Sequence, residues 1–455
     1  MAVAPSSEPL ERPHISAAGW RIVLLASLGG TLEYYDFVIF GIFAAQIGRA
    51  FFPSQDSLVS LMVTFTTFAI GYLARPIGGL VLGRLGDKFG RRGVFLASIF
   101  VTSAATLGIG IVPSYASWGV AASVIVVLLR LTQGFCLGGE LPGAITYVVE
   151  SAPRMAPFVC SVVFGFVTMG VALGTTIALI VGNVMTPADA ALYGWRIAFV
   201  TGGLLGLASF WLRRSFEESP EFAELKRLAA ASKEPIGELV RTHPGQIFIG
   251  IAAQAVTAVF AGLFFAHMPA YLTQVAKYDA STAVYAQTYG VVLHAALIVA
   301  AGWVADHYPP YLLLRIGAIL LAAGAYPFYA ALSTHSVNII VLMTMAALVG
   351  ALVNGTFAFV TADLFPTRIR FSGVAAVQNI SQTAFGGTAP LVATALIRDL
   401  QTPVAPALIV MVCGIVTCAG TFAVARRCGR VQTARAAAAA SLPVEPHPRR
   451  GSAEA

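Results

Sequence analysis

Long apolar runs, separated by short polar segments, fill almost the whole chain. Each run falls within or above the range of about 17–25 residues that a helix needs to cross the hydrocarbon core of a bilayer. Because no water is available there, the backbone must bond internally, which a helix achieves. The pattern predicts twelve spanning helices, at about 17–47, 57–82, 93–112, 117–149, 157–182, 196–213, 245–275, 282–305, 311–332, 337–363, 371–397 and 403–425.

The longest polar connection, Arg214 to Pro244, divides these spans into six and six. A segment at 302–311 repeats the Gly and Asp of the segment at 83–92 with the same spacing, about half a chain length later. Two related six-helix halves are typical of secondary transporters. The predicted organisation is an N-terminal tail at 1–16, a bundle at 17–213, a central loop at 214–244 with a helix at 220–233, a second bundle at 245–426, and a disordered tail at 427–455.

Composition and charge support a membrane protein. Hydrophobic residues make up 57% of the 455, and charged residues only 11%, against about 25% in soluble domains. The net charge of +7 does not indicate nucleic acid, because the bases lie in loops next to the membrane. With both termini in the cytoplasm, most of the 28 Lys and Arg residues fall on the cytoplasmic side, whereas the other side has only Arg49, Lys277, Arg398 and the interfacial Arg196. The five cysteines show no metal or disulfide spacing.

The segment from Gly83 to Arg92 carries four bases and one acid between the second and third spans. We expect a tight cytoplasmic loop there, in which the glycines allow a sharp turn. Asp87 at a helix terminus can accept hydrogen bonds from free backbone N–H groups or pair with a base. In the second half, Asp306 is its counterpart.

Ionisable residues inside spans cost about 2.5–3.5 kcal/mol on insertion scales and are candidates for function. Glu33 and Asp36 are three residues apart in the first span, so both lie on one helical face. Arg75 lies in the second span, just before a proline. Arg130 lies near the centre of the fourth span, and Gln133 follows on the same face.

The simplest hypothesis is that Arg130 is neutralised by Glu33 or Asp36. An anionic substrate that engages Arg130 withdraws this base, and the carboxylate then takes up a proton. The alternative is a structural ion pair that only holds two helices together. Polar side chains in the second half, chiefly Gln254, Asn354 and Asn379, suit either substrate binding or interhelical hydrogen bonds.

Other features have simpler interpretations. His267 and His294 are single intramembrane histidines, which more often bond to a neighbouring helix than relay protons. Acidic residues near the cytoplasmic ends are gate or capping groups: Glu140, Glu150 and Asp363. Gly386, Gly387 and Pro390 break the eleventh span.

Several motifs together carry a family resemblance. They are Gly83-Arg84-Leu85-Gly86-Asp87-Lys88-Phe89-Gly90-Arg91-Arg92, Leu32-Glu33-Tyr34-Tyr35-Asp36-Phe37, Ala74-Arg75-Pro76-Ile77-Gly78-Gly79, Arg130-Leu131-Thr132-Gln133-Gly134, Glu217-Glu218-Ser219-Pro220-Glu221-Phe222 and Phe365-Pro366-Thr367-Arg368. In this order and spacing, the set resembles the metabolite:proton symporter branch of the major facilitator superfamily.

The resemblance implies an all-α membrane protein with 12 transmembrane helices in two six-helix pseudo-repeat bundles. The residues themselves predict proton coupling by Glu33, Asp36 and Arg130, and the resemblance supports Arg130, because the arginine of that fourth-helix motif is linked to proton coupling in the superfamily. The predicted substrate-binding residues are Tyr34, Arg75, Arg130, Gln133, Gln254, Asn354 and Asn379. The resemblance also implies a cytoplasmic gating motif made of Gly83, Asp87, Gly90, Arg91, Arg92 and Asp306. Pro142, after Glu140, departs from the usual pattern and is expected to kink the fourth span.

The predicted function is import of a small organic acid, such as citrate or a dicarboxylate, in symport with protons by alternating access. The alternative is proton-coupled uptake of a zwitterionic osmolyte such as proline or betaine. An integral-membrane enzyme or a channel fits less well, because no interfacial His, Cys or acidic cluster and no repeated pore charges are present. We expect no cofactor, no nucleic-acid partner, and a protein that works as a monomer in the bacterial inner membrane.

Overall fold

The computed structural model describes residues 17–89, 91–137, 140–152, 155–215, 239 and 241–440. All regular elements in these ranges are helices. Those of the first half are α1 (Ala17–Ile42), α2 (Ala44–Phe51), α3 (Ser57–Phe89), α4 (Arg91–Ile111), α5 (Tyr115–Trp118), α6 (Val120–Cys136), α7 (Glu140–Ser151), α8 (Ala156–Val184), α9 (Pro187–Asp189), η1 (Ala190–Gly194) and α10 (Trp195–Ser215).

The second half repeats this plan with more interrupted helices. Its elements are α13 (Pro244–Phe260), η2 (Ala261–His267), α14 (Met268–Ala270), η3 (Tyr271–Val275), α15 (Ala280–His307), α16 (Pro310–Thr334), α17 (Ile339–Asn354), α18 (Phe357–Asp363), η4 (Thr367–Ile369), α19 (Arg370–Ser381), η5 (Gln382–Gly387), α20 (Ala389–Leu400) and α21 (Pro406–Ala440). In the described part of the chain, nine helices are long and apolar enough to span a membrane, and two shorter apolar helices lie at Leu96–Ile111 and Val120–Cys136.

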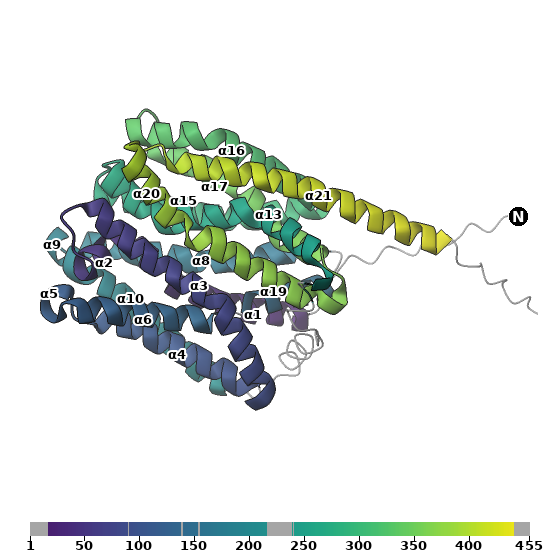
Figure 1. Ribbon diagram of the computed structural model, residues 1–455, viewed down its shortest axis with the longest axis horizontal. Coiled ribbons are helices and arrows are strands. Elements are labelled where there is room, and N and C mark those ends of the chain that lie inside the picture. Colours follow the sequence, from purple (N-terminus) through teal and green to yellow (C-terminus); the bar gives the residue numbers. More distant parts are fainter. Residues whose placement is uncertain are drawn as a thin grey trace, which may run out of the picture.

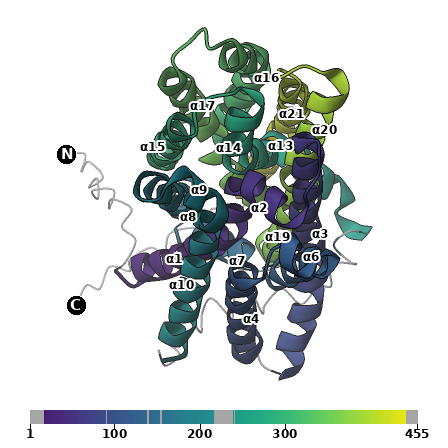
Figure 2. The same ribbon diagram turned by 90° about the vertical axis from the view of Figure 1, so that its left-hand side faces the viewer.

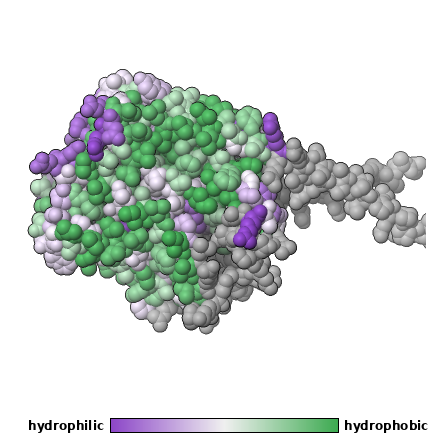
Figure 3. All heavy atoms as spheres, in the orientation of Figure 1, coloured by the Kyte–Doolittle hydropathy of each residue, from purple (hydrophilic) through white to green (hydrophobic). Residues whose placement is uncertain are grey.

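The two halves lie side by side with their long helices roughly parallel (Figure 1). Seen from one end, α13–α21 form one group and α1–α10 the other (Figure 2). Hydrophobic residues dominate the flank that Figure 3 shows, and hydrophilic residues gather toward the ends, as a membrane-embedded bundle requires. We call the end where α1 begins and α21 leaves the terminal end, and the opposite end, with α2, α5 and α9, the far end.

Several boundaries differ from the sequence prediction. The expected loop at 83–92 is largely helical, because α3 runs to Phe89 and α4 starts at Arg91. Its arginines, lysine and leucine have good helix propensity, which outweighs the glycines between them. The fourth span is two helices, since α6 ends at Cys136 and α7 begins at Glu140. The expected kink therefore falls before Pro142, which occupies the first turn of α7, where a missing N–H costs little.

The chain end also differs from the prediction. α21 continues to Ala440, so the first part of the tail at 427–455, predicted to be disordered, is helical. The alanine-rich run from 436 has high helix propensity, which explains this extension. The break in the eleventh span is confirmed: η5 ends at Gly387, and Pro390 lies in the first turn of α20. The predicted helix at 220–233 lies outside the described residues.

Glycines let α3 and α6 approach until their backbones touch. A Cβ atom on Gly78 of α3 would overlap the Phe135 carbonyl of α6, and one on Gly134 of α6 would overlap the Gly71 carbonyl of α3. This close packing brings Arg75 of α3 and Arg130 of α6 into one region of the first half.

The halves contact each other toward both ends. At the terminal end, the Arg370 Nη1 atom is 3.1 Å from Glu150 Oε1, which joins α19 to α7. Nearer the far end, the Phe65 ring of α3 packs 5.4 Å from the His267 ring of η2, measured between centroids. Between these levels, the Thr383 hydroxyl donates to the Tyr72 carbonyl at 2.9 Å.

Candidate functional site

Arg130 is fully buried at the middle of the first half. Its Nη1 atom donates to Gln133 Oε1 at 2.9 Å, and Nη2 donates to the Phe37 carbonyl at 3.4 Å. The three-residue spacing places Gln133 on the same helical face, as the sequence predicts. Nε is buried without a hydrogen-bond partner. Among the described residues, this cation forms no ion pair with an acid.

Aromatic rings surround the Arg130 guanidinium. Its central carbon lies 4.3 Å from the centre of the Phe37 ring, 4.4 Å from Phe40 and 5.5 Å from Phe68. Cation–π attraction in such dry surroundings reaches about 2 kcal/mol. These contacts and the two hydrogen bonds allow a cation to remain buried without a directly bonded carboxylate.

Arg75 lies over the same Phe37 ring, 4.3 Å from its centre, and 4.4 Å from the Tyr72 ring. Only 5% of its surface is exposed, and its Nε and Nη2 atoms are buried without a hydrogen-bond partner. These two atoms form one edge of the planar guanidinium, the kind of edge that binds a carboxylate with two parallel hydrogen bonds. One turn away, Tyr72 contacts the second half through Thr383. The free edge therefore belongs to a residue close to the interface between the halves.

Asp36 is linked to Arg130 indirectly. The Gln133 Nε2 atom donates to the Thr106 hydroxyl at 2.7 Å, and Thr106 in turn lies beside the Asp36 carboxylate. Asp36 is 5% exposed and lies within electrostatic reach of Arg130. The sequence predicts that Asp36 and Arg130 interact, and the structure places them within electrostatic reach without a direct bond. The sequence misses Thr106, because a single threonine in an apolar run gives no signal. The side chain of Glu33 lies outside the described part of the structure.

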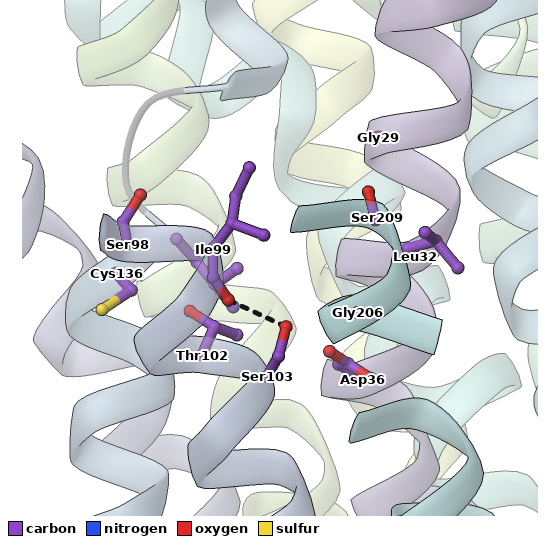
Figure 4. Close-up of a pocket in the computed structure, with 11 residues that line it drawn as sticks. Gly29, Leu32, Asp36, Ser98, Ile99, Thr102, Ser103, Cys136, Gly206 and Ser209 are labelled. Atoms are coloured by element: carbon purple, nitrogen blue, oxygen red, sulfur yellow. Dashed lines mark hydrogen bonds between the residues drawn. The ribbon is translucent and has the colours of Figure 1, made fainter. Parts of the chain in front are cut away.

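A pocket opens beside Asp36 between α1, α4, α6 and α10 (Figure 4). Arg130 does not line it. The sequence-based hypothesis places both groups at one watery hollow, whereas here the carboxylate alone meets the pocket, and the cation is packed among aromatic rings.

In the second half, two predicted substrate contacts are engaged in interhelical hydrogen bonds. Gln254 Nε2 donates to the Thr361 hydroxyl at 2.7 Å, which joins α13 to α18. Asn354 Nδ2 lies 3.1 Å from His294 Nε2, and His294 Nδ1 lies 2.9 Å from the Ala347 carbonyl. Since the carbonyl requires Nδ1 to donate, Nε2 accepts from the amide, and His294 is held as a neutral tautomer. Both histidine nitrogens are thereby occupied.

Other polar atoms of the second half have no partner. Gln378 Oε1, Ser381 Oγ and Gln382 Oε1 are buried and unpaired on α19 and η5. Their spacing of three and four residues places them on one face, a signal that the sequence contains but that is easy to miss at Ser381. Asn379, predicted to bind substrate, is half-buried on α19, and Tyr34 is buried on α1; neither lacks a partner.

His267 has one free nitrogen. The Thr394 hydroxyl donates to the Pro390 carbonyl at 2.8 Å, so it must accept from His267 Nε2, 3.2 Å away. Nδ1 is then a bare acceptor, buried without a partner. This residue is a neutral histidine at the interface with Phe65.

The predicted gating residues fall into two groups. The first group, Gly83, Asp87, Gly90, Arg91 and Arg92, lies where the structure describes no side-chain surroundings. Asp306 Oδ1 accepts a 3.0 Å hydrogen bond from the backbone N–H of Phe158, in the first turn of α8. An acid of the second half thus caps a helix of the first half. Glu150 pairs with Arg370, the first residue of α19.

These features define a class of protein: a membrane transporter of two related helical halves, with buried charges close to the interface between them. Comparisons with known proteins agree. The chain is 33% identical to "Putative proline/betaine transporter" of Staphylococcus aureus (strain COL) over 401 residues, covering 85% of this chain and 84% of that protein. It is 29% identical to "Proline/betaine transporter" of Salmonella typhimurium over 415 residues, covering 87% and 81%.

Solved structures show the same fold. The xylose transporter XylE from E. coli, in a partially occluded inward-open conformation, superposes with a TM-score of 0.68 at 18% identity, covering 90% of this chain and 97% of that one. The family model for the Major Facilitator Superfamily matches residues 26–390. The chain belongs to the major facilitator superfamily, and it is a transporter rather than an enzyme.

Proposed function

We propose that the protein takes up a small zwitterion, such as proline or betaine, together with protons. The observation that carries this proposal is the free edge of Arg75: two buried N–H-bearing atoms without a partner, next to aromatic faces and close to the second half. A carboxylate satisfies this edge with two charge-assisted hydrogen bonds. The cationic end of the same molecule meets aromatic rings or unpaired oxygen atoms.

The sequence favours an organic acid, whereas the names of the relatives favour the zwitterion alternative. The arrangement of charges supports the second choice. A dicarboxylate needs a cation for each carboxylate. In the second half, no Lys or Arg whose side chain the structure describes is buried, and the buried polar atoms without a partner belong to uncharged groups. One carboxylate per substrate fits the site better than two.

Proton coupling is assigned to Asp36 and Arg130. A substrate carboxylate bound at Arg75 adds negative charge to the aromatic cluster that Arg75 shares with Arg130. The substrate carboxylate and Asp36 then compete for electrostatic interaction with Arg130. Gln133 and Thr106 lie between Arg130 and Asp36. A protonated Asp36 then accompanies the bound substrate while one half rocks against the other. Glu33, on the same helical face, is a second candidate carboxylate.

Two sets of contacts are proposed to hold the terminal end closed. One is the 83–92 segment with Gly83, Asp87, Gly90, Arg91 and Arg92, and the other is the cap that Asp306 forms on α8. The clustering of bases supports a cytoplasmic terminal end. A monomer in the bacterial inner membrane is sufficient for this cycle.

The test is uptake of labelled proline, betaine, citrate, a dicarboxylate and shikimate into proteoliposomes, with and without an imposed pH gradient. We expect accumulation of proline or betaine that requires the gradient. Accumulation of citrate or the dicarboxylate instead would mean that the substrate is an organic acid. Gradient-independent uptake would contradict the proton coupling.

A further inference from the structure

The pocket beside Asp36 lies entirely within the first half. Its walls come from α1, α4, α6 and α10, and include Gly29, Ser103, Cys136 and Ser209 (Figure 4). Its water-accessible volume is about 50 Å³, which holds a few water molecules at about 10–15 Å³ each. No described residue of the second half lines it.

The direction of the pocket follows from the directions of its helices. Thr106 and Gly202 mark the level of Asp36, since a Cβ atom on Gly202 would lie 2.6 Å from Asp36 Oδ1. α1 and α4 run from the terminal end toward the far end, so lining residues that precede Asp36 and Thr106 lie on the terminal side. α6 and α10 run the opposite way, so lining residues that follow Gln133 and Gly202 also lie on the terminal side.

Every other lining residue falls on that side. Gly29 precedes Asp36 by seven positions, Ser98 precedes Thr106 by eight, and Ser209 follows Gly202 by seven. At 1.5 Å per helical residue, the pocket extends roughly 10 Å from the carboxylate toward the terminal end. Asp36 therefore lies at its inner end.

The lining suits water. It includes four hydroxyl side chains, those of Ser98, Thr102, Ser103 and Ser209. The Ser103 hydroxyl donates to the Ile99 carbonyl at 2.8 Å, so its lone pairs are free to accept a hydrogen bond from water. On its other side, Asp36 faces Thr106 and the Arg130 network.

We propose that this pocket, called the Asp36 pocket, is a proton path between Asp36 and the terminal end, separate from the substrate path between the halves. The inference rests on the proposed proton coupling. A proton leaves the Asp36 carboxyl for a pocket water, which becomes hydronium, and the carboxylate then interacts with Arg130 again. The described titratable or charged groups facing Asp36 are Arg130 on α6 and Tyr35 on α1, with Cys136 farther along the pocket.

Cys136 provides a handle for testing this path. One variant retains only Cys136, and a matched variant retains only Cys418, a half-buried thiol on α21 in the other half. Both are treated, in oriented vesicles, with a charged methanethiosulfonate that does not cross membranes. We expect Cys136 to react from the terminal side. Modification should lower proton-driven proline accumulation at least tenfold, while proline counterflow, which needs no net proton movement, stays within twofold. Modified Cys418 should change neither measurement.

A second pair of variants avoids chemical labelling. Ser209→Leu fills the pocket and should reproduce the split between accumulation and counterflow. Thr66→Leu, which also replaces a hydroxyl residue by leucine but at an exposed position of α3 away from the pocket, should behave as the parent chain. Equal loss of both activities, or reaction of Cys136 only from the far side, would overturn the proposal. If the untreated chain accumulates neither proline nor betaine, the proposed function fails, and the sidedness of Cys136 labelling still tests the path.

Discussion

The Phe37 ring is shared by two guanidinium groups, each 4.3 Å from its centre. Two buried cations so close together repel each other unless negative charge enters between them. Asp36, which lies beside Thr106 and within electrostatic reach of Arg130, offsets part of this charge from one side. In the proposed function, a substrate carboxylate at the free edge of Arg75 offsets the rest. The cluster is thus incomplete without an anion.

Arg75→Lys tests this role. Lysine keeps the charge but cannot offer two parallel N–H groups to a carboxylate. Losing one charge-assisted hydrogen bond, about 1.5–3 kcal/mol, should raise the KM for proline roughly 10- to 100-fold with a smaller change in kcat. The measurement is initial-rate uptake over a range of proline concentrations. An unchanged KM would place the carboxylate elsewhere.

Asp36→Asn tests proton coupling. The amide cannot release a proton, so accumulation driven by a pH gradient should fall to the level reached without a gradient, while counterflow continues. Asp279→Asn is a suitable control, because Asp279 is an exposed acid that caps α15 outside the membrane. Full accumulation by the Asp36 variant would shift the role to Glu33.

At the scale of helices, the position of this cluster depends on how closely α3 and α6 approach. Gly71, Gly78 and Gly134 form a contact in which backbone meets backbone. A wider separation would move Arg75 away from Phe37 and weaken the shared cation–π contact. The glycines therefore position the charges without touching them.

Gly78→Ala should force the two helices apart. Overpacking of this kind costs about 1–3 kcal/mol, so the variant should unfold at a lower denaturant concentration in detergent and transport proline more slowly. Gly182→Ala is the matched control, because nothing lies within 4 Å of a Cβ atom at that position of α8. Equal stability of the two variants would show that α3 and α6 tolerate a wider spacing.

Hydrophobic length predicts where helices cross the membrane, but not where their hydrogen-bond ladder changes. All twelve predicted spans coincide with helices or groups of helices. The π-helical turns at η2 and η3 in the seventh span have no counterpart in the sequence pattern, because one extra residue per turn leaves the apolar run unchanged. Glycine and proline near position 387 do predict the interruption at η5.

In the whole molecule, the two halves contact each other at the terminal end and again nearer the far end, through Phe65 and His267. Contacts at both places correspond to a closed arrangement. The terminal end is joined by the Glu150–Arg370 pair and by the Asp306 cap on α8. Among the described residues, opening this end breaks these two polar contacts and some packing. Each is modest in energy, so small changes should shift the balance between open and closed states.

The Glu150–Arg370 pair tests this balance. Both side chains are about 15% exposed, and such a pair contributes about 1 kcal/mol or less. Glu150→Gln and Arg370→Gln should each increase the open population at the terminal end by up to about fivefold, and the double variant should add little more. Spin labels across the two halves can measure these populations. Additive effects in the double variant would mean that the pair does not act as a unit.

The sequence identifies the charged members of the site but not how they are connected. Arg75, Asp36 and Arg130 stand out because charge is rare in apolar runs. Phe37, Thr106 and Ser381 resemble ordinary membrane residues, and their roles depend on which helices become neighbours. Conversely, Gln254 and Asn354 look like substrate ligands in the sequence, but tertiary contacts use their amides to join helices.

Small residues recur where the halves meet. A Cβ atom on Gly41 would lie 2.5 Å from the Ala266 methyl, one on Gly302 would overlap Ser161, and one on Gly387 would lie 2.5 Å from the Tyr72 ring. Surfaces with few protruding side chains can move past each other without side chains interlocking. The rate of each transport cycle then depends on the polar contacts at the terminal end, Glu150–Arg370 and Asp306–Phe158. Replacing any one of these three glycines by a larger residue should therefore slow transport.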